Sequence, residues 1–278
     1  MVFGEGKTMI DKVFGFIGCG NMGGALATAA RRELAGENVL LANRSPEKAR
    51  ALAEKLGAQV VDNAGAAERS DYLFLGVKPN MMAGMLEGIR DILVSRDEPC
   101  VLVTMAAGLT IEAVRRMAGV DYPVIRIMPN TPAAVGKGVL LCCADGASEA
   151  QVEVFKAVMA GAGLLDFVEE RLIDAGSAVS GCGPAFAAML IEALADGGVA
   201  CGLPRAKAQA YAAQTLLGTA ALALETGAHP GALKDAVCSP GGSTIQGVRA
   251  LEAGGFRGAA IEAVIAAYEK TLELGKQK

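Results

Sequence analysis

Six residues near the start of the chain have types and spacing that suit a phosphate group. An apolar run, Val13–Ile17, leads into Gly18-Cys19-Gly20-Asn21-Met22-Gly23 and then into a helix-forming segment at 25–27. Glycines permit a tight turn and let the backbone approach a pyrophosphate, whose charge then lies on free N–H groups at a helix N-terminus. This spacing also arises by chance, so a plain glycine-rich turn is the alternative. Its place in a first strand-to-helix turn favours a dinucleotide site.

A second group of polar residues, Asn43-Arg44-Ser45, directly follows the apolar run Val39–Ala42. A carboxylate at this point would accept a hydrogen bond from a ribose 2′-hydroxyl, as in NAD-binding loops. A guanidinium beside a hydroxyl and an amide would instead hold a 2′-phosphate. The sequence therefore predicts NADPH as the cofactor, with NADH as an alternative.

Small residues, prolines and amides follow the later apolar runs of this half of the chain: Asn63, Val77-Lys78-Pro79-Asn80, Ala106-Ala107-Gly108 and Pro129-Asn130-Thr131-Pro132. In a doubly wound sheet, ligands bind beyond the carboxyl ends of the strands. A rim of small and rigid residues suits a nicotinamide ring, and Asn63 suits a ribose or the adenine end. Ordinary loop chemistry is the alternative at each position.

The loop Ser239-Pro240-Gly241-Gly242-Ser243-Thr244 precedes the helical stretch Ile245–Glu252. The N–H groups and hydroxyls of Ser243 and Thr244 would hold a small carboxylate. Alternatively, Ser243 is only a helix N-cap, although two consecutive glycines exceed what capping requires.

Sequence motifs for metal binding and for hydrolysis do not occur in the chain. The one histidine, His229, precedes Pro230, and there is no H-E-x-x-H, C-x-x-C or G-x-S-x-G motif. The sequence therefore predicts no metal site and disfavours hydrolysis. His229 is either a catalytic acid or a helix-end residue. A hydride carrier without an evident general acid suits a substrate that already carries its proton, such as an iminium.

The elements that would position these residues alternate as strands and helices. The expected strands are Val13–Ile17, Val39–Ala42, Val60–Val61, Tyr72–Val77, Val101–Met105 and Val124–Met128, and the expected helices are Pro46–Leu56, Met81–Ser95 and Ile111–Met117. This alternation predicts an α/β Rossmann-type doubly wound sheet. Two more strands, Gly138–Cys143 and Leu165–Phe167, flank a helix at Ser148–Ala160 and should extend one edge. The first domain is expected to span 1–172, with 1–12 as a flexible leader.

Residues 173–278 are expected to form an all-helical domain for substrate binding and dimerisation. The expected helices are Asp174–Val199 with a kink or restart at Pro184, Arg205–Glu225, Gly231–Val237, Thr244–Glu252 and Arg257–Leu274. Several are apolar around much of their circumference, as at 187–191 and 220–224, so a second surface should cover them. A compact monomeric bundle rich in alanine is the alternative.

Charge and cysteine content limit the partners and the compartment. The net charge is −4 and there is no basic run, so the sequence predicts no nucleic acid and no anionic membrane as a partner. The seven cysteines suit buried, reduced thiols, which indicates the cytoplasm. The stretch Ala206–Leu224 comes nearest to a membrane span, but Lys207 and two glutamines interrupt it.

Seven motifs together resemble pyrroline-5-carboxylate reductase. They are Gly18–Gly24, Val77-Lys78-Pro79, Ala106-Ala107-Gly108, Arg126–Pro132, Ser180–Ala185, Glu192–Val199 and Ser239–Ile245. The resemblance runs from about Val13 to Leu274. It implies NAD(P)H-dependent reduction of 1-pyrroline-5-carboxylate to L-proline, the last step of proline synthesis, by dimers that often assemble into decamers.

The resemblance also assigns roles to residues. It implies that Gly18 to Gly23 contact the pyrophosphate, that Asn43-Arg44-Ser45 contact the 2′-phosphate, and that Asn63 and Val77-Lys78-Pro79 lie on the ribose and nicotinamide side. Gly242-Ser243-Thr244 would bind the substrate carboxylate, with Thr244 facing the ring nitrogen. Cys182 and Ser243 depart from the usual Ser and Thr, and Ser243 keeps both a backbone donor and a hydroxyl.

Two other functions stay open at this stage. A β-hydroxyacid dehydrogenase shares such a glycine loop and a helical second domain, but Asp174–Val199 lacks the lysine which that family requires. A non-catalytic NADP-binding scaffold would present its helical face to a partner protein.

Overall fold

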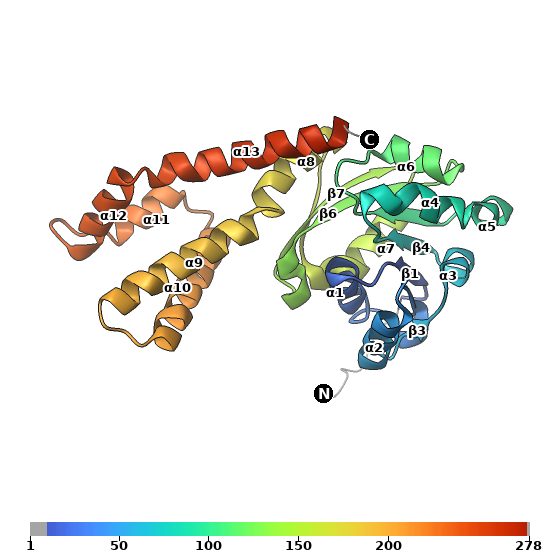
Figure 1. The fold of residues 1–278 in the computed structure, drawn as a ribbon, viewed down its shortest axis with the longest axis horizontal. Helices are drawn as coiled ribbons and strands as arrows, with labels where there is room; N and C mark the ends of the chain where they lie inside the picture. Colours follow the sequence, from blue (N-terminus) through green and yellow to red (C-terminus); the bar gives the residue numbers. More distant parts are fainter. Residues whose placement is uncertain (1–9, 277–278) are drawn as a thin grey trace. The chain divides into compact units, whose positions relative to one another are not determined.

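The computed structural model describes residues 10–276, which form two compact units (Figure 1). The first unit comprises the chain up to Gly181 together with the segment from Tyr268 onward. The second unit is Cys182–Ala267.

One eight-stranded sheet forms the centre of the first unit. Its strands are β1 (Phe14–Ile17), β2 (Val39–Ala42), β3 (Gln59–Val60), β4 (Tyr72–Leu75), β5 (Val101–Thr104), β6 (Val124–Pro129), β7 (Gly138–Asp145) and β8 (Gly163–Phe167). The order is β3-β2-β1-β4-β5-β6-β7-β8. The first six strands are parallel, while β7 pairs antiparallel with β6 and parallel with β8. The predicted doubly wound sheet and its two added edge strands are confirmed.

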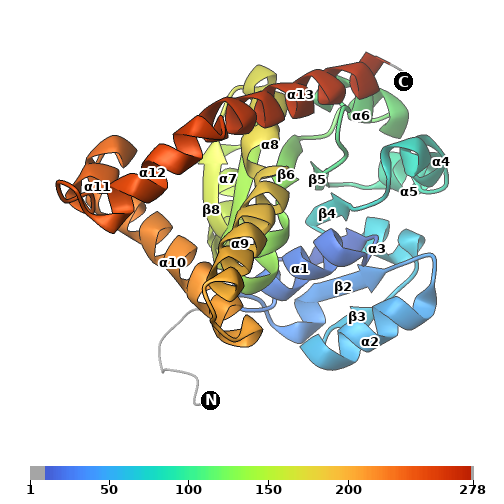
Figure 2. The ribbon, with the colours of Figure 1, turned by 60° about the vertical axis from the view of Figure 1, so that its left-hand side comes forward.

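Helices cover both faces of this sheet (Figure 2). One face packs against α1 (Asn21–Ala30), α2 (Pro46–Leu56) and α7 (Glu149–Met159), and the other against α3 (Asn63–Arg69), α4 (Met82–Glu87), α5 (Arg90–Ser95) and α6 (Ile111–Ala118). Short 3₁₀ helices lie at Gly36–Asn38, Pro79–Met81, Thr131–Val135 and Ala160–Ala162. The central strands are buried on both faces, which explains their continuous apolar runs.

Two elements differ from the sequence-based expectation. The single helix expected at Met81–Ser95 is two helices, α4 and α5, because the backbone leaves the helical region at Ile89. The helix α3 was not predicted, and it begins where the Asp62 side chain accepts a hydrogen bond from the Gly65 N–H at 2.7 Å. A helix of seven residues gives too short a pattern for periodicity to detect.

The helix α8 (Glu170–Ser180) packs on the sheet of the first unit. Its Ile173 is fully buried and packs against Met128 of β6 and Leu141 of β7. The division between the units therefore falls after Gly181, later than the boundary expected at residue 172. The start of the chain differs as well. Residues 1–9 of the expected leader lie outside the described residues, whereas Ile10 packs on the core and Lys12 pairs with Asp71 at 3.0 Å.

The second unit is helical throughout its regular structure. Its helices are α9 (Gly183–Ala200), α10 (Arg205–Thr226), α11 (Pro230–Ala236), α12 (Ser243–Ala253) and most of α13 (Phe256–Lys276). The expected restart near Pro184 is confirmed, since α8 ends at Ser180 and α9 begins at Gly183. The helices α9 and α10 lie side by side, joined by Ala195, Ala208 and Ala212 (Figure 1).

Many large apolar side chains of the second unit are exposed on the single chain. They include Met189, Leu217, Leu222, Leu224 and Ile261, and Leu224 is 82% exposed. One helical run, Glu170–Ala200, is long and apolar enough to cross a membrane by length and composition. It is a different stretch from the one that the sequence indicated, and its first third packs on the sheet.

Candidate functional site

The carboxyl ends of β1, β2 and β4 open onto a cleft of about 600 Å³ in the first unit. Strand order reverses between β1 and β4, and such a point is where doubly wound sheets bind their ligands. The cleft is lined by Ile17, Gly18, Gly20, Asn43, Arg44, Ser45, Lys48, Asn63, Gly76, Val77, Lys78, Asn80, Met81, Gly84 and Met85. Eight predicted cofactor residues thus share one cavity.

The three glycines of the first loop have different tasks. Gly18 has φ +106°, and a Cβ there would lie 2.4 Å from the Gly76 carbonyl oxygen. A Cβ on Gly23 would lie 2.0 Å from the Gly18 carbonyl oxygen. Gly20 has no described heavy atom within 4 Å of the site of a Cβ, so its backbone is open to the cleft. The first and third glycines allow the turn to close, and the second leaves room for a ligand.

The N-terminus of α1 follows Gly20, and no side chain among residues 10–276 caps it. Uncapped N–H groups at a helix N-terminus attract an anion. The neighbouring Cys19 thiol is 8% exposed, and burial raises its pKa to about 11. It therefore stays uncharged at neutral pH and does not repel a phosphate. These features fit a dinucleotide pyrophosphate.

Asn43 lies at the cleft, but its amide is engaged with the protein. Its Oδ1 accepts a hydrogen bond from the Cys19 N–H at 2.9 Å, and its Nδ2 donates to the Ser45 carbonyl at 3.0 Å. The side chain therefore ties the first loop to the end of β2. The role of Asn43 beside a 2′-phosphate stays a prediction, since Nδ2 carries a second N–H besides the one that donates to Ser45.

Arg44, Ser45 and Lys48 form the exposed rim of the cleft beyond β2. Lys48 lies in the first turn of α2, and it also lines a second hollow of about 460 Å³ between α1 and α2. The sequence analysis missed Lys48.

The remaining predicted cofactor residues do not line the cleft. Cys19 and Asn21 line the second hollow, while Met22 and Gly23 are in the first turn of α1 and Pro79 begins a 3₁₀ helix. Ala106 is 2% exposed and its side chain belongs to the core, so only its backbone could face a ligand. Ala107 and Gly108 complete this turn, with Gly108 at φ +70°.

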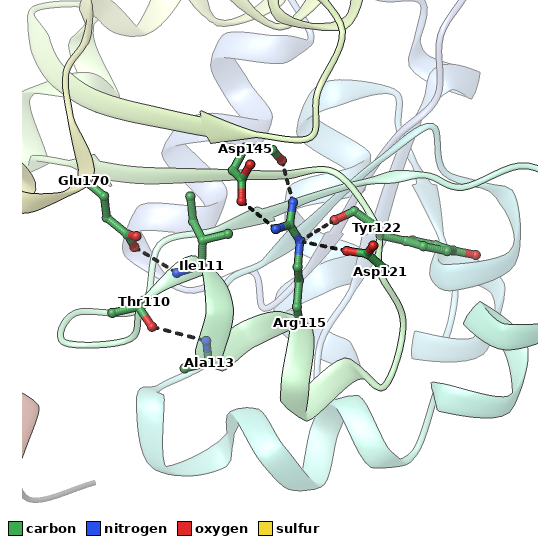
Figure 3. A network of polar contacts seen from close by, with 8 residues as sticks. All are labelled: Thr110, Ile111, Ala113, Arg115, Asp121, Tyr122, Asp145 and Glu170. Atoms are coloured by element: carbon green, nitrogen blue, oxygen red, sulfur yellow. Dashed lines mark hydrogen bonds and ion pairs between the residues drawn. The ribbon is translucent and has the colours of Figure 1, made fainter.

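Polar contacts hold the helix that follows this turn (Figure 3). At the N-terminus of α6, the Thr110 hydroxyl accepts from the Ala113 N–H and Glu170 accepts from the Ile111 N–H at 2.8 Å. At the other end, Arg115 donates to the Asp145 carboxylate at 2.5 Å. The turn at 106–108 is thus fixed through α6.

The predicted carboxylate loop lies in the second unit. Gly241 has φ +70°, and a Cβ on Gly242 would lie 2.4 Å from the Ser239 hydroxyl oxygen. Gly242 is the N-cap residue of α12, Ser243 is the first helical residue, and no described side chain caps this end. The alternative in which Ser243 is the N-cap is therefore wrong. The first turn of α12 presents uncapped N–H groups, as an anion site requires.

Other candidate groups are accounted for locally. The His229 ring accepts a hydrogen bond at Nδ1 from the Gly231 N–H at 3.1 Å, so it caps α11 as a helix-end residue. Within residues 10–276, no cluster of three potential metal ligands occurs. All seven cysteines are free. Burial is confirmed for Cys19, Cys100 and Cys142, whereas Cys143, Cys182 and Cys238 are only partly buried and Cys201 is exposed on the single chain.

Two family models match the two parts of this chain. Residues 170–274 match the family model described as pyrroline-5-carboxylate reductase dimerisation, and residues 13–108 match the model described as NADP oxidoreductase, coenzyme F420-dependent. Pyrroline-5-carboxylate reductase of Escherichia coli (strain K12) is 40% identical over 96% of this chain and 100% of its own length. The chain belongs to the pyrroline-5-carboxylate reductase family.

Other members of the pyrroline-5-carboxylate reductase family are similar to this chain in sequence and in fold. The protein of Synechocystis sp. is 46% identical over 78% of this chain and 79% of its own length. The solved structure of the reductase from Coxiella burnetii has a TM-score of 0.87 at 31% identity, over 95% of this chain and 99% of that one. The Plasmodium falciparum structure, which has NADP bound, has a TM-score of 0.85 at 29% identity, over 96% of this chain and 100% of that one. The NADP-binding Rossmann fold and the helical dimerisation domain are thereby confirmed.

Proposed function

We propose that the protein reduces 1-pyrroline-5-carboxylate to L-proline with NADPH, the final step of proline biosynthesis. Family membership over nearly the whole chain carries this proposal. Two uncapped helix N-termini support it, one at the dinucleotide cleft and one at the loop 241–244. NADH is the alternative cofactor.

Bound NADPH supplies a hydride to the carbon of the imine C=N bond. The residues of the chain bind and orient the two reactants, since no proton donor is needed for a protonated imine. The N–H groups of Ser243 and Thr244 hold the substrate carboxylate beside Gly242, whose own N–H donates to the Ser239 carbonyl at 3.0 Å. The Thr244 hydroxyl faces the ring nitrogen. Catalysis is then mostly a matter of positioning.

The cofactor contacts follow from the cleft. The backbone from Gly18 to Gly23 holds the pyrophosphate, and the Arg44 guanidinium with the Ser45 hydroxyl holds the 2′-phosphate. Lys48 adds a second positive charge beside that phosphate. Asn63 and Val77-Lys78-Pro79 bind the ribose and nicotinamide side, and the backbone of 106–108 completes the rim.

The proposal includes an assembly and a location. The exposed apolar side chains of the second unit and its match to a dimerisation family support a homodimer, and decamers are the larger form expected. Seven free cysteines support the cytoplasm. A net charge of −4 argues against nucleic acid as a partner. The packing of α8 on the sheet argues against insertion of the run Glu170–Ala200 into a membrane.

Oxidation of NADPH, followed by its absorbance with 1-pyrroline-5-carboxylate as the substrate, tests this proposal. The expected result is consumption of NADPH with stoichiometric formation of proline. A β-hydroxyacid substrate with NADP⁺ is the matched control, and turnover of that substrate alone would contradict the proposal. Cofactor binding without turnover of either substrate would favour the non-catalytic scaffold instead.

A further inference from the structure

The Glu170 side chain, on α8, joins three elements of the first unit. Its Oε1 accepts a hydrogen bond from the Ile111 N–H of α6 at 2.8 Å (Figure 3). The same oxygen accepts from the guanidinium of Arg126 in β6 at 3.1 Å. A second acid of α8, Asp174, accepts from the other terminal nitrogen of this buried arginine at 2.7 Å. Among the described hydrogen bonds, the one to α6 distinguishes Glu170 from Asp174.

The contact with α6 lies at the N-terminus of that helix, where backbone N–H groups have no partner within the helix. Thr110 is the N-cap residue, and its hydroxyl accepts from the Ala113 N–H at 3.2 Å. Ile111 is the first helical residue, and its N–H is the donor to Glu170. A carboxylate at this point forms a charge-assisted hydrogen bond and interacts favourably with the helix dipole. Glu170 thus holds the first turn of α6 from outside the helix.

The turn 106–108, which precedes α6, leaves the sheet beside the cofactor cleft. Leu75 and Thr104, the last residues of β4 and β5, are paired in these two parallel strands. The segments that follow the two strands therefore begin next to each other at the carboxyl edge of the sheet. After β4, Val77 and Lys78 line the cleft. The turn after β5 thus adjoins the side of the cleft to which the proposed function assigns the nicotinamide.

Buried side chains connect this turn to the first residue of α6. Ala106, Leu109 and Ile111 are all buried in the same core cluster. The Leu109 N–H also donates to the Ala106 carbonyl at 3.3 Å, and Gly108 between them has φ +70°. A displacement of the first turn of α6 would therefore displace the turn 106–108 as well.

We infer that Glu170 is a positioning residue for the nicotinamide end of the cofactor. Glu170 does not line the cleft, and it acts through the Ile111 N–H and α6 on the turn 106–108. The inference rests on the proposed function, in which this turn is part of the cofactor rim, and it involves the first unit alone. Without the carboxylate, the turn has to be ordered when the cofactor binds, and that ordering lowers the affinity.

Two ligands separate the nicotinamide end of the cofactor from the rest of it. NADPH is the complete cofactor, and 2′-phospho-ADP-ribose keeps the pyrophosphate and the 2′-phosphate but lacks the nicotinamide. Both are titrated into the full-length protein without substrate. The emission of the reduced nicotinamide in bound NADPH gives a second readout of the surroundings of that ring.

Glu170→Ala removes the contacts with Ile111 and Arg126. Asp174→Ala is the matched control, because it removes the other carboxylate that α8 pairs with Arg126 and leaves the contact with α6 in place. Glu170→Gln keeps an acceptor oxygen for the Ile111 N–H. Thr110→Val removes the hydroxyl that caps the same turn of α6 without changing the ion pairs of Arg126.

We expect Glu170→Ala to raise the Kd for NADPH about threefold to tenfold and to leave the Kd for 2′-phospho-ADP-ribose within about twofold of wild type. The emission of bound NADPH should move toward that of free NADPH. Glu170→Gln should restore most of the affinity, and Asp174→Ala should bind both ligands nearly as wild type does. If Glu170→Ala fails to fold, Thr110→Val decides, because it should cause the same selective loss of NADPH affinity.

Three results would overturn the inference. They are an unchanged Kd for NADPH in Glu170→Ala, an equal loss of affinity for both ligands, and the same selective loss in Asp174→Ala. A wild-type protein that binds NADPH but does not reduce the imine would instead refute the proposed function, and the comparison of the two ligands would still decide the role of Glu170.

Discussion

Arg44 is the residue on which the proposed cofactor preference depends most directly. A charge-assisted contact contributes about 1.5–3 kcal/mol, so Arg44→Ala should raise KM for NADPH about tenfold to a hundredfold. KM for NADH should change little, because NADH lacks the 2′-phosphate. Lys48→Ala should act in the same direction but less strongly, since a lysine makes a point contact rather than a bidentate one.

Arg50→Ala is the matched control, because Arg50 is exposed on α2, the helix that carries Lys48, but does not line the cleft. Steady-state kinetics with both cofactors make the comparison. An equal loss with NADPH and NADH would show that Arg44 does not contact the 2′-phosphate.

Thr244 has its proposed role in substrate positioning rather than in cofactor binding. Thr244→Ala keeps the backbone N–H and removes one hydroxyl, which should lower kcat/KM for the imine about twofold to tenfold. The Kd for NADPH, measured by fluorescence titration, should not change. Thr219→Ala is a suitable control, because the Thr219 hydroxyl donates to the Thr215 carbonyl of its own helix at 2.8 Å. Parallel losses of cofactor and substrate affinity would contradict the separate roles of the two loops.

Single residues show where sequence-based inference ends. The residue types at positions 43–45 indicated a phosphate site. The Asn43 side chain, however, accepts a hydrogen bond from the Cys19 N–H, and this contact depends on the packing of β1 beside β2. Lys48 was missed because its position at the cleft depends on how α2 leaves the sheet. From the sequence, Arg126 was identified only as the first residue of the motif Arg126–Pro132. Its burial and its two acidic partners are tertiary facts.

At the scale of elements, the glycines of the loop between β1 and α1 should differ in how they tolerate replacement by alanine. Gly20→Ala should leave the free energy of unfolding nearly unchanged, because no described atom obstructs its Cβ. It should weaken NADPH binding, because the Cβ enters the space open to the ligand. Gly23→Ala should destabilise the protein, since its Cβ would overlap the Gly18 carbonyl.

Urea denaturation and NADPH titration of both variants check this pair of expectations. Gly88→Ala is the control, because a Cβ there meets only ordinary contacts at 3.5 Å and Gly88 does not line the cleft. Unimpaired NADPH binding by Gly20→Ala would show that the pyrophosphate does not approach this loop.

Most elements were predictable because their patterns are local. The helix Pro46–Leu56 has a proline at its first position and Gly57 after its end, and its bounds are as expected. The break between α4 and α5 was not predicted, because the apolar periodicity continues through 88–89. The direction of β7 was also not predicted. The short connection through Thr131–Val135 permits an antiparallel neighbour, whereas a parallel one needs a longer crossover.

At the scale of the whole molecule, the exposed apolar helices require a covering surface. Met189→Asp on α9 and Leu217→Asp on α10 should each weaken the oligomer, because a charge would be buried without a partner. Sedimentation velocity should then show smaller species. Lys207→Asp, at an exposed polar position of α10, is the control. An unchanged sedimentation coefficient in both apolar variants would place the interface elsewhere.

The buried thiols predict a dependence of stability on alkaline pH. Burial raises the pKa of Cys100 to about 11 and that of Cys142 to about 12. Since these folded-state values exceed the ordinary value of 9.0, their contribution is complete below pH 9 and is lost as the pH rises toward 11 and 12. Urea denaturation at one protein concentration should show the decline, and Cys100→Ala with Cys142→Ala should make it shallower, while Cys19, whose pKa burial also raises to about 11, still contributes. Cys201→Ala should leave it unchanged, and an equal decline in all variants would show that other groups cause it.

The central claim is that the first unit binds the dinucleotide while the second binds the substrate carboxylate at 242–244. A crystal structure with NADP⁺ and L-proline bound together tests it most directly. We expect the proline carboxylate on the N–H groups of Ser243 and Thr244, the pyrophosphate at Gly18 to Gly23, and the proline ring against the nicotinamide. A carboxylate bound at any other site, with the loop 241–244 empty, would contradict it.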